Sequence, residues 1–317
     1  RRQRQMCIRD RNYGGPTRFY ELRSGQILDL AEQLKINKIT GGRAVVAGNI
    51  LSGKMDIFAA NERGKNFLYY NSDGYFQDIA EDYKVDDQYE NGRGTTLTDI
   101  FYRGRLDIVT SNWNGYHRAF VLEDNKFRDI ATPTYNIPTR IRTVISADFD
   151  NDGYDEIFMN NIGEPNKLFK IKENGFFEEI NIKNAYEANG LGTGAAVADI
   201  DDDGILELLI AHGESGMQPL TMYKADIKKD FNYLRVKPLN KFGAPARGAT
   251  VILKSNLRNH AKTIDAGSGY LCQMEPVAHY GIRDGEKNIS IKIIWTNGLT
   301  ETLNINELNK TIEVNQK

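Results

Sequence analysis

Two short sequence boxes recur along the chain at a spacing of about fifty residues. The first box is an acidic or turn-like loop followed by a short apolar strand, and it begins at positions 48, 99, 148 and 199. The second box places an acidic residue after a turn and an aromatic or apolar residue, at positions 29, 78, 129 and 179. Because two independent boxes keep one period, the sequence predicts a chain of repeated structural units.

Each unit has the pattern of β-strands. Residues 66–71 precede the turn Asp73-Gly74, and Phe76 starts the next apolar stretch, which predicts a hairpin with a two-residue tip. Units of 40–50 residues with several strands are typical of propeller blades. We therefore expect an all-β fold: a partial β-propeller of four to five blades over residues 12–228, and a small β domain over 229–317, where the period stops.

Residues 1–11 are treated separately. They begin RRQRQMCIRD, which resembles the in-frame translation of a transposase sequencing adapter, so they are excluded from the fold prediction. A genuine basic tail is the alternative. On the adapter interpretation, the native start of the protein is missing and Cys272 is the only native cysteine, so no internal disulfide is expected.

The charge balance excludes some classes of function. The formal net charge is −2, so no basic field favours nucleic acid or an anionic membrane. No apolar run approaches the ~20 residues that span a bilayer. We expect neither nucleic-acid binding nor membrane insertion.

Two of the four first boxes are strongly acidic. Residues 148–156 read DFDNDGYDE and residues 199–207 read DIDDDGILE, with carboxylates at loop positions 1, 3, 5 and 9 and glycine at position 6. Such carboxylates repel one another unless a hard cation with oxygen ligands binds between them, and calcium tolerates irregular geometry best. We predict about two calcium sites. The predicted ligands are Asp148, Asp150, Asp152, Tyr154, Glu156, Asp199, Asp201, Asp203, Ile205 and Glu207.

An EF-hand is not expected, because loop position 12 is Met159 in one loop and Ile210 in the other, where an EF-hand needs glutamate. Exposed acidic turns without an ion are the alternative to calcium sites. The boxes at 48 and 99 lack most of the carboxylates, so no metal is predicted there. Arg103 is expected to pair with Asp99 or Asp107 in place of a cation.

These motifs resemble a known family. The repeats are similar to FG-GAP/VCBS units, and the tail resembles an ASPIC/UnbV domain through Gly248-Ala249, Gly267–Leu271, His279–Ile282 and Trp295–Gly298. The combination is that of the cartilage acidic protein 1-like family. Cys272 and Thr296 stand where that family often has serine and proline. Its propellers have more blades than the four to five found here, which implies that further blades precede residue 12.

The resemblance implies an extracellular or periplasmic calcium-binding scaffold that binds a protein or glycan, with Trp113 and Tyr116 as candidate contact residues. Ordinary packing between blades is the alternative for both. A second hypothesis is an accessory protein or enzyme of a biosynthetic pathway, for which His279, Tyr270 and Cys272 would be the candidates. They show no catalytic spacing, so a non-enzyme is favoured. A tail that docks on the propeller is a third possibility.

Overall fold

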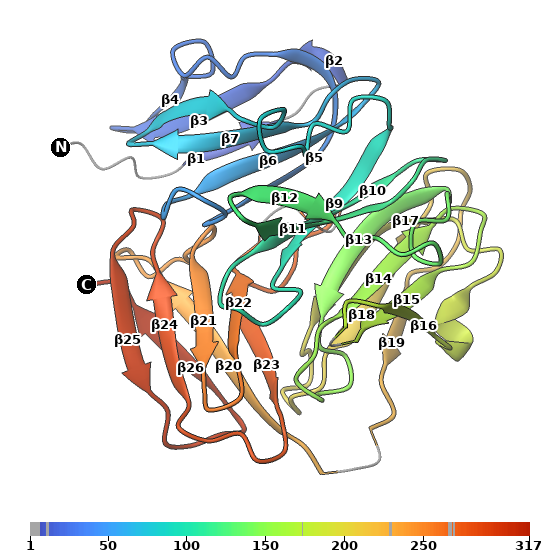
Figure 1. Cartoon of the computed structure of the whole chain (residues 1–317), viewed down its shortest axis with the longest axis vertical. Helices are drawn as coiled ribbons and strands as arrows, with labels where there is room; N and C mark the ends of the chain where they lie inside the picture. Colours follow the sequence, from blue (N-terminus) through green and yellow to red (C-terminus); the bar gives the residue numbers. More distant parts are fainter. Residues whose placement is uncertain (1–6, 11–12, 173, 228–229, 266–267, 269) are drawn as a thin grey trace.

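The computed structural model describes residues 7–10, 13–172, 174–227, 230–265, 268 and 270–317. Four consecutive antiparallel sheets fan out around a common axis as propeller blades (Figure 1). Their strands are β5 (Ile39–Gly48), β6 (Asp56–Glu62), β7 (Phe67–Ser72) and β8 (Tyr75–Asp78); β9 (Gly92–Thr98), β10 (Asp107–Asn112), β11 (Arg118–Glu123) and β12 (Lys126–Asp129); β13 (Ile141–Ala147), β14 (Glu156–Asn161), β15 (Lys167–Ile171) and β16 (Phe177–Ile180); and β17 (Gly192–Ala198), β18 (Glu207–His212) and β19 (Thr221–Lys224).

The first strand of each blade lies innermost. Strands β5, β9, β13 and β17 contact one another in that order, which is the arrangement of a propeller around its axis. A short 3₁₀ helix, Lys183–Tyr186, precedes β17. The fold class predicted from the repeats, an all-β partial propeller with a C-terminal β domain, is confirmed.

A further three-stranded sheet lies at the N-terminal end. It contains β1 (Cys7–Asp10), β3 (Arg18–Arg23) and β4 (Gln26–Asp29), while β2 (Tyr13–Pro16) pairs with β5. Strand β1 falls within the residues interpreted as adapter sequence, and it occupies a sheet edge beside β3. The origin of residues 1–11 stays a prediction.

The second sequence box recurs because its acid closes each blade. Asp78 Oδ1 accepts hydrogen bonds from the N–H of Ala80 at 3.1 Å and of Leu68 at 3.3 Å, which fixes the turn that leaves the outer strand. Two other acids make the same pair of contacts. Asp29 accepts from the N–H groups of Ala31 and Phe19, and Asp129 accepts from those of Ala131 and Ala119. Glu179 differs, since its carboxylate pairs with Lys167.

The C-terminal domain consists of two sheets around its own core. One sheet contains β20 (Asn232–Leu239), β23 (Ala278–Ile282) and β26 (Lys310–Asn315), with β20 and β26 parallel; the other contains β21 (Thr250–Lys254), β22 (Asn259–Thr263), β24 (Ser290–Ile294) and β25 (Thr300–Asn304). The core includes Leu234, Val251, Ile291 and Trp295. The Tyr280 hydroxyl donates to the Val251 carbonyl at 2.8 Å and so links the sheets. The predicted boundary at 228 lies outside the described residues.

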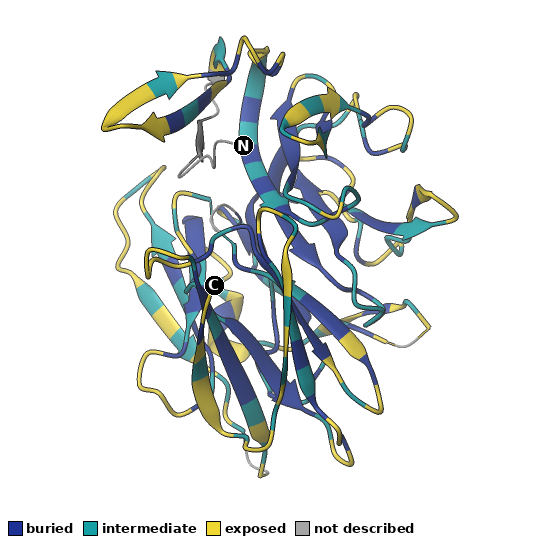
Figure 2. Cartoon of the chain, turned by 90° about the vertical axis from the view of Figure 1, so that its left-hand side faces the viewer, coloured by how far each residue is buried: buried dark blue, intermediate teal, exposed yellow. Residues whose placement is uncertain are grey.

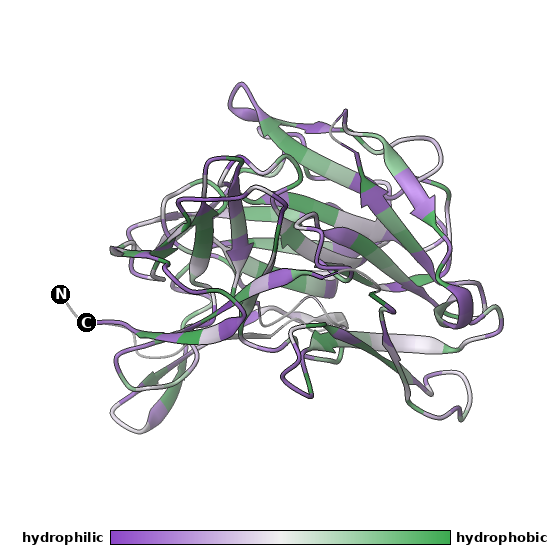
Figure 3. Ribbon diagram, turned by 90° about the horizontal axis from the view of Figure 1, so that it is seen from below, coloured by the Kyte–Doolittle hydropathy of each residue, from purple (hydrophilic) through white to green (hydrophobic). Residues whose placement is uncertain are grey.

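The C-terminal domain docks on the propeller. Its Ile252 and Ala261 belong to one apolar cluster with Ile50 and Leu106, which lie in the loops after β5 and β9. Figure 2 shows buried residues continuing along the strands of both parts, and Figure 3 shows the hydrophobic residues concentrated in the strands. The tail therefore covers the face of the propeller where the inner strands end. No helix in the described ranges is long and apolar enough to cross a membrane.

Candidate calcium loops at the domain interface

The first acidic loop connects β13 to β14 and gathers its carboxylates around one point. Oxygens of Asp148, Asp150 and Glu156 all lie within 4.8 Å of one another. Asp148 and Glu156 are each only 1% exposed. Asp148 Oδ1 and Glu156 Oε1 are buried and have no hydrogen-bond partner. Buried carboxylate oxygens without a donor are costly, and a cation would satisfy both of them.

Backbone N–H groups hold this loop in its curled form. Gly153 donates to Asp148 Oδ2 at 2.9 Å, Phe149 donates to Glu156 Oε2 at 3.0 Å and Tyr154 donates to Asp152 at 3.0 Å. Gly153 has a φ of 84°, so the turn expected of the sixth position is present. The carboxylates therefore fix the conformation of the loop through hydrogen bonds, in addition to giving it a negative charge.

A lysine faces the carboxylates from the next strand. Lys170 on β15 pairs with Glu156 across the sheet, and its ammonium lies against Asp152, 3.5 Å from Asp150 Oδ2 and 3.6 Å from Glu156 Oε1. Burial, and then repulsion from Asp155, raise the pKa of Asp148 to about 7. Burial and the charge of Asp148 raise the pKa of Glu156 well above its usual range. One lysine thus leaves the acidic group under-neutralised.

The second acidic loop, between β17 and β18, is more open. Oxygens of Asp199, Asp201 and Asp203 lie within 4.8 Å of one another, but Asp201 and Asp203 are exposed. Lys224 on β19 lies 2.8 Å from Asp201, 2.8 Å from Asp203 and 2.6 Å from Glu207. This loop has two basic partners, because Arg235 Nη1 of the C-terminal domain is 3.1 Å from Asp199 Oδ2.

The seventh-position residues take part in the loops through their backbone. Ile205 N–H donates to Asp203 Oδ1 at 2.9 Å, as Tyr154 does to Asp152. The centre of the Tyr154 ring lies 5.2 Å from that of the Tyr102 ring, and Lys170 Nζ lies 5.8 Å from it. Their role as calcium ligands stays a prediction, as does that of the eight acids.

The two loops that lack the acidic pattern are held in place by an ion pair in one case and by backbone hydrogen bonds to an aspartate in the other. Arg103 Nη2 lies 3.4 Å from Asp107 Oδ1, so the predicted pairing of this arginine with Asp107 is confirmed, while its role in place of a cation stays a prediction. Burial raises the pKa of Asp107 to about 7 and that of Asp99 to about 6. In the first loop, Asp56 accepts hydrogen bonds from the backbone N–H of two loop residues, Leu51 at 2.7 Å and Ser52 at 2.9 Å.

The C-terminal domain contacts the first-position aspartate of three successive loops. Each of these aspartates uses Oδ2 as the acceptor, and the donors come from three different strands of the tail. The contacts are Ala261 N to Asp99 at 3.0 Å, Gly281 N to Asp148 at 3.0 Å and Arg235 Nη1 to Asp199 at 3.1 Å. The acidic loops are therefore both candidate metal sites and the docking surface of the tail, which the sequence did not predict.

Asp155, the eighth residue of the first acidic loop, is buried in this interface. Its carboxylate lies 2.5 Å from Lys262 Nζ and 3.3 Å from His260 Nε2, both on β22. Burial alone would raise the pKa of Asp155, but Lys262 and His260 hold it well below its usual range. Asp155 thus fixes the tail rather than contributing to the cation cluster.

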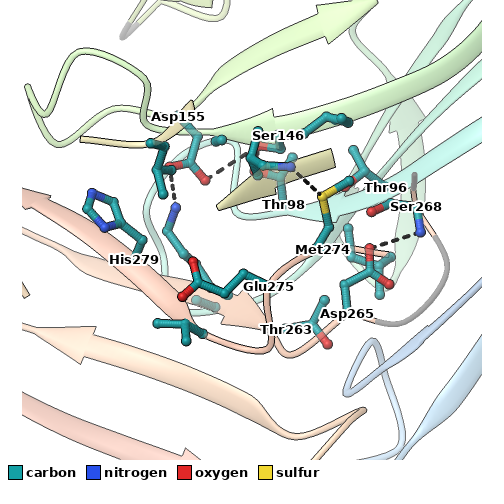
Figure 4. A pocket seen from close by; sticks show the side chains of 18 residues that line it. Thr96, Thr98, Ser146, Asp155, Thr263, Asp265, Ser268, Met274, Glu275 and His279 are labelled. Atoms are coloured by element: carbon teal, nitrogen blue, oxygen red, sulfur yellow. Dashed lines mark hydrogen bonds and ion pairs between the residues drawn. The ribbon is translucent and has the colours of Figure 1, made fainter. Parts of the chain in front are cut away.

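A cavity of about 80 Å³ with a mixed polar and apolar lining lies between the inner strands and the tail (Figure 4). Its lining includes Thr98 and Ser146 from the propeller and Glu275 from the tail. Asp155 and His279 line the same side, where Figure 4 shows the ion pair of Asp155 with its lysine partner. The cavity has room for a few water molecules, and we assign it no ligand.

His279 is a buried, uncharged side chain at the same interface. Its Nε2 lies 2.7 Å from Asn151 Oδ1, its Nδ1 has no hydrogen-bond partner, and the Tyr233 ring stacks on it. Burial, followed by the positive charges of Lys262 and Arg235, lowers the pKa of His279 to about 3; Asp155 opposes this shift only partly.

We expect His279 to lower the stability of the folded protein as the pH falls below about 6.5, the pKa of histidine in the unfolded chain. The unfolded state binds a proton there, whereas folded His279 does not until about pH 3. Buried acids with a raised pKa, such as Asp148, act in the opposite direction. This histidine alone should cost about 2 kcal/mol of stability at pH 5. The His279→Gln variant should lack that part of the pH dependence. Urea unfolding of both proteins at pH 7.5 and pH 5.0 measures it, and an equal change in stability between the two pH values for the two proteins would contradict the prediction.

The candidate residues for other functions lie apart. Trp113 is half-buried between blades, and Tyr116 on the same hairpin is 54% exposed. Burial raises the pKa of the Cys272 thiol, which is the wrong direction for a nucleophile. Among the described side chains, no hydrogen bond links Cys272, Tyr270 and His279. The arrangement gives no support to the catalytic hypothesis.

Comparison with known proteins agrees with the architecture. FG-GAP-like repeats match residues 99–159 and 148–210, and the ASPIC and UnbV family matches residues 240–317. Cartilage acidic protein 1 of Xenopus tropicalis is 45% identical over 303 residues, which cover 90% of this chain and 47% of that protein; the Homo sapiens protein is 44% identical and covered to 46%. The chain spans about half the length of these relatives.

A solved structure, Saccharomyces cerevisiae Sqt1, aligns with a TM-score of 0.40 at 10% identity, covering 95% of this chain and 82% of that one, and no argument rests on it. The order of the domains supports the assignment: the FG-GAP-like repeats run from the loop after β9 into β18, and the ASPIC/UnbV match begins just after β20. The chain therefore belongs to the FG-GAP-repeat proteins that end in an ASPIC/UnbV domain.

Proposed function

We propose that this chain is a non-enzymatic, calcium-stabilised scaffold of the extracellular or periplasmic space that binds a protein or glycan. The observation that carries the calcium assignment is the pair of buried oxygens, Asp148 Oδ1 and Glu156 Oε1, without hydrogen-bond partners inside an acidic loop. The relatives are named after cartilage, an extracellular tissue, which supports the location.

The donor set fits calcium. Calcium accepts six to eight oxygen ligands in flexible geometry, and each acidic loop offers four carboxylates. At the first loop a bound Ca²⁺ would be held by Asp148, Asp150, Asp152 and Glu156, and it would supply the countercharge that Lys170 provides only in part. The second loop already has Lys224 and Arg235 against its carboxylates. We therefore expect the loop at 148 to bind calcium more tightly than the loop at 199.

Isothermal titration of the full chain with Ca²⁺ tests this assignment. We expect a stoichiometry near two, with the tighter site lost in Asp150→Asn and the weaker one in Asp201→Asn. Asp284→Asn, at an exposed position far from both loops in the sequence, is the matched control and should bind as the parent does. A stoichiometry of zero or four would contradict the assignment.

Thermal and urea unfolding give a second measurement. Extracellular calcium modules have dissociation constants of about 10⁻⁴–10⁻³ M. At 1 mM Ca²⁺ and a dissociation constant near 10⁻⁴ M, each site should add about 1.4 kcal/mol to the free energy of unfolding, or about 3 kcal/mol for both. An excess of chelator should abolish the gain, and it should be roughly halved in the Asp150→Asn variant.

A further inference from the structure

Three arginines occupy equivalent positions on three successive inner strands. Each of β5, β9, β13 and β17 has a register irregularity against its neighbour near its start. Arg43 and Arg142 are the extra residues on β5 and β13, and Arg93 lies within the irregular stretch of β9. Bulges re-aim the side chain they carry and are enriched beside functional sites. Because the inner strands surround the axis, these side chains converge at the end opposite the acidic loops.

The arginines share their partners. Arg43 Nη2 lies 2.5 Å and Arg93 Nη1 3.2 Å from the same Glu62 oxygen, and Arg142 Nη2 lies 3.0 Å from Glu214. In these ion pairs of the described residues, three guanidinium groups share two carboxylates.

Two of the guanidinium groups are buried and only partly hydrogen-bonded. Arg93 is 5% exposed and Arg142 is 8% exposed. Nε and Nη1 of Arg93 and Nε of Arg142 have no hydrogen-bond partner, and the contact of Arg93 with Glu62 is an ion pair without a hydrogen bond. Burial, and then the charge of Arg43, lower the pKa of Arg93. Arg142 adds to this shift, whereas Glu62 and Tyr270 of the C-terminal domain oppose it. Unpaired buried N–H groups of this kind call for an acceptor.

An aromatic ring borders the cluster. The Arg142 guanidinium lies 4.4 Å and that of Arg93 5.2 Å from the centre of the Trp113 ring. Trp113 is half-buried, so the residue stays partly accessible while its ring lies against both guanidinium groups. Glu214, the partner of Arg142, is 39% exposed at its side chain, which keeps the cluster in contact with solvent.

We propose that Arg43, Arg93 and Arg142, with Trp113, form an oxyanion site for the sulfate group of an anionic glycan at the end of the propeller opposite the acidic loops. Sulfate offers acceptor oxygens in several directions, which suits guanidinium groups that approach from three blades. The accessible part of Trp113 then lies beside the sugar that carries the sulfate. This deepens the proposed function by naming a ligand class, and it rests on that function for the location outside the cell.

Titration of the full chain with sodium sulfate, a sulfated heparin tetrasaccharide and an unsulfated tetrasaccharide tests the proposal. We expect saturable binding of sulfate and tighter binding of the sulfated tetrasaccharide, weakened at least tenfold in Arg142→Gln and Arg93→Gln. Arg128→Gln removes the same charge from an exposed ion pair with Glu123 and should bind like the parent. Arg142→Lys keeps the charge without the Nε–H, and it should still weaken binding severalfold.

Sulfate protection against heating provides a measurement that a purely structural ion-pair cluster would not show. Sulfate should raise the melting temperature of the parent and of Arg128→Gln, but not that of Arg142→Gln. Equal binding by all three proteins, or no saturable binding of either sulfated probe, would overturn the proposal. Saturable binding of sulfate with no binding of the sulfated tetrasaccharide would show that the ligand is not a glycan. Calcium titration of the same samples keeps the two proposals apart, because loss of calcium binding with intact tetrasaccharide binding would reject the calcium role alone.

Discussion

Replacing Arg258 by methionine is expected to lower the free energy of unfolding by about 3–5 kcal/mol, because it leaves a buried carboxylate without its partner. The Arg258 and Glu286 side chains are 1% and 0% exposed, and Nε and Nη2 lie 2.9 Å and 3.2 Å from the Glu286 oxygens. The guanidinium also donates to the carbonyls of Gly281, at 2.5 Å, and of Gly153 in the acidic loop. Urea unfolding at pH 7.5 measures the loss.

The double variant Arg258→Met/Glu286→Leu separates two contributions to this loss: the missing ion pair, and the cost of burying the Glu286 carboxylate without its arginine. Because the uncompensated carboxylate accounts for most of the cost, the double variant should recover a large part of the stability. Arg128→Met, which breaks the exposed pair with Glu123, should cost no more than about 1 kcal/mol. A loss at Arg258 as small as that at Arg128 would show that the interface does not depend on this pair.

The second large effect is expected at Gly281, where strand β23 meets the acidic loop. A Cβ atom there would lie 2.4 Å from Asp148 Oδ2 and 2.6 Å from the backbone carbon of Asn151. Backbone cannot move aside as a flexible side chain can, so Gly281→Ala must push the tail away from the loop. We expect a loss of about 3 kcal/mol, at the upper end of the cost of overpacking.

Hydrogen exchange locates this effect. The amides of the loop at 148–156 and of β23 should lose protection together in Gly281→Ala, since Gly281 N donates to Asp148 Oδ2. Gly285→Ala is the control: its Cβ meets no atom within 4 Å, and its φ of 78° adds only about 1 kcal/mol of strain. Loss of protection limited to β23 would mean that the loop does not depend on the tail.

The parts of the fold that the sequence predicted are those set by local pattern. The fifty-residue spacing identified the blades because the same turn and the same capping acid recur in each of them, as at Asp78 and Asp129. The Arg103–Asp107 pair could be expected because the two residues share one loop. A further local signal was available but unused. The backbone N–H groups of Asn61 and Asn161, which end the first box, each donate to the side-chain oxygen of an asparagine five residues later.

The rest depends on residues distant in sequence. Lys170 and Lys224 face their loops from the third strand of each blade, 14 and 17 residues after Glu156 and Glu207. Because these two spacings differ, the lysines could not be recognised as equivalent from the sequence. The sixth-position glycines were explained by backbone freedom alone. The structure adds a second reason: a Cβ at Gly204 would lie 2.1 Å from the ring of Tyr233 in the C-terminal domain. Such a contact between segments distant in sequence cannot be predicted from the residue spacing within either segment.

The docking of the tail across loops from three successive blades has a mechanical consequence. Neighbouring blades of a propeller are ordinarily kept at their angle by closure of the ring, which stops them from splaying. The C-terminal domain also contacts the loops that follow β9, β13 and β17, so it holds the angles between these three blades. Any force or ligand that tilts one of these blades against the next must therefore also distort the contacts between the C-terminal domain and the loops.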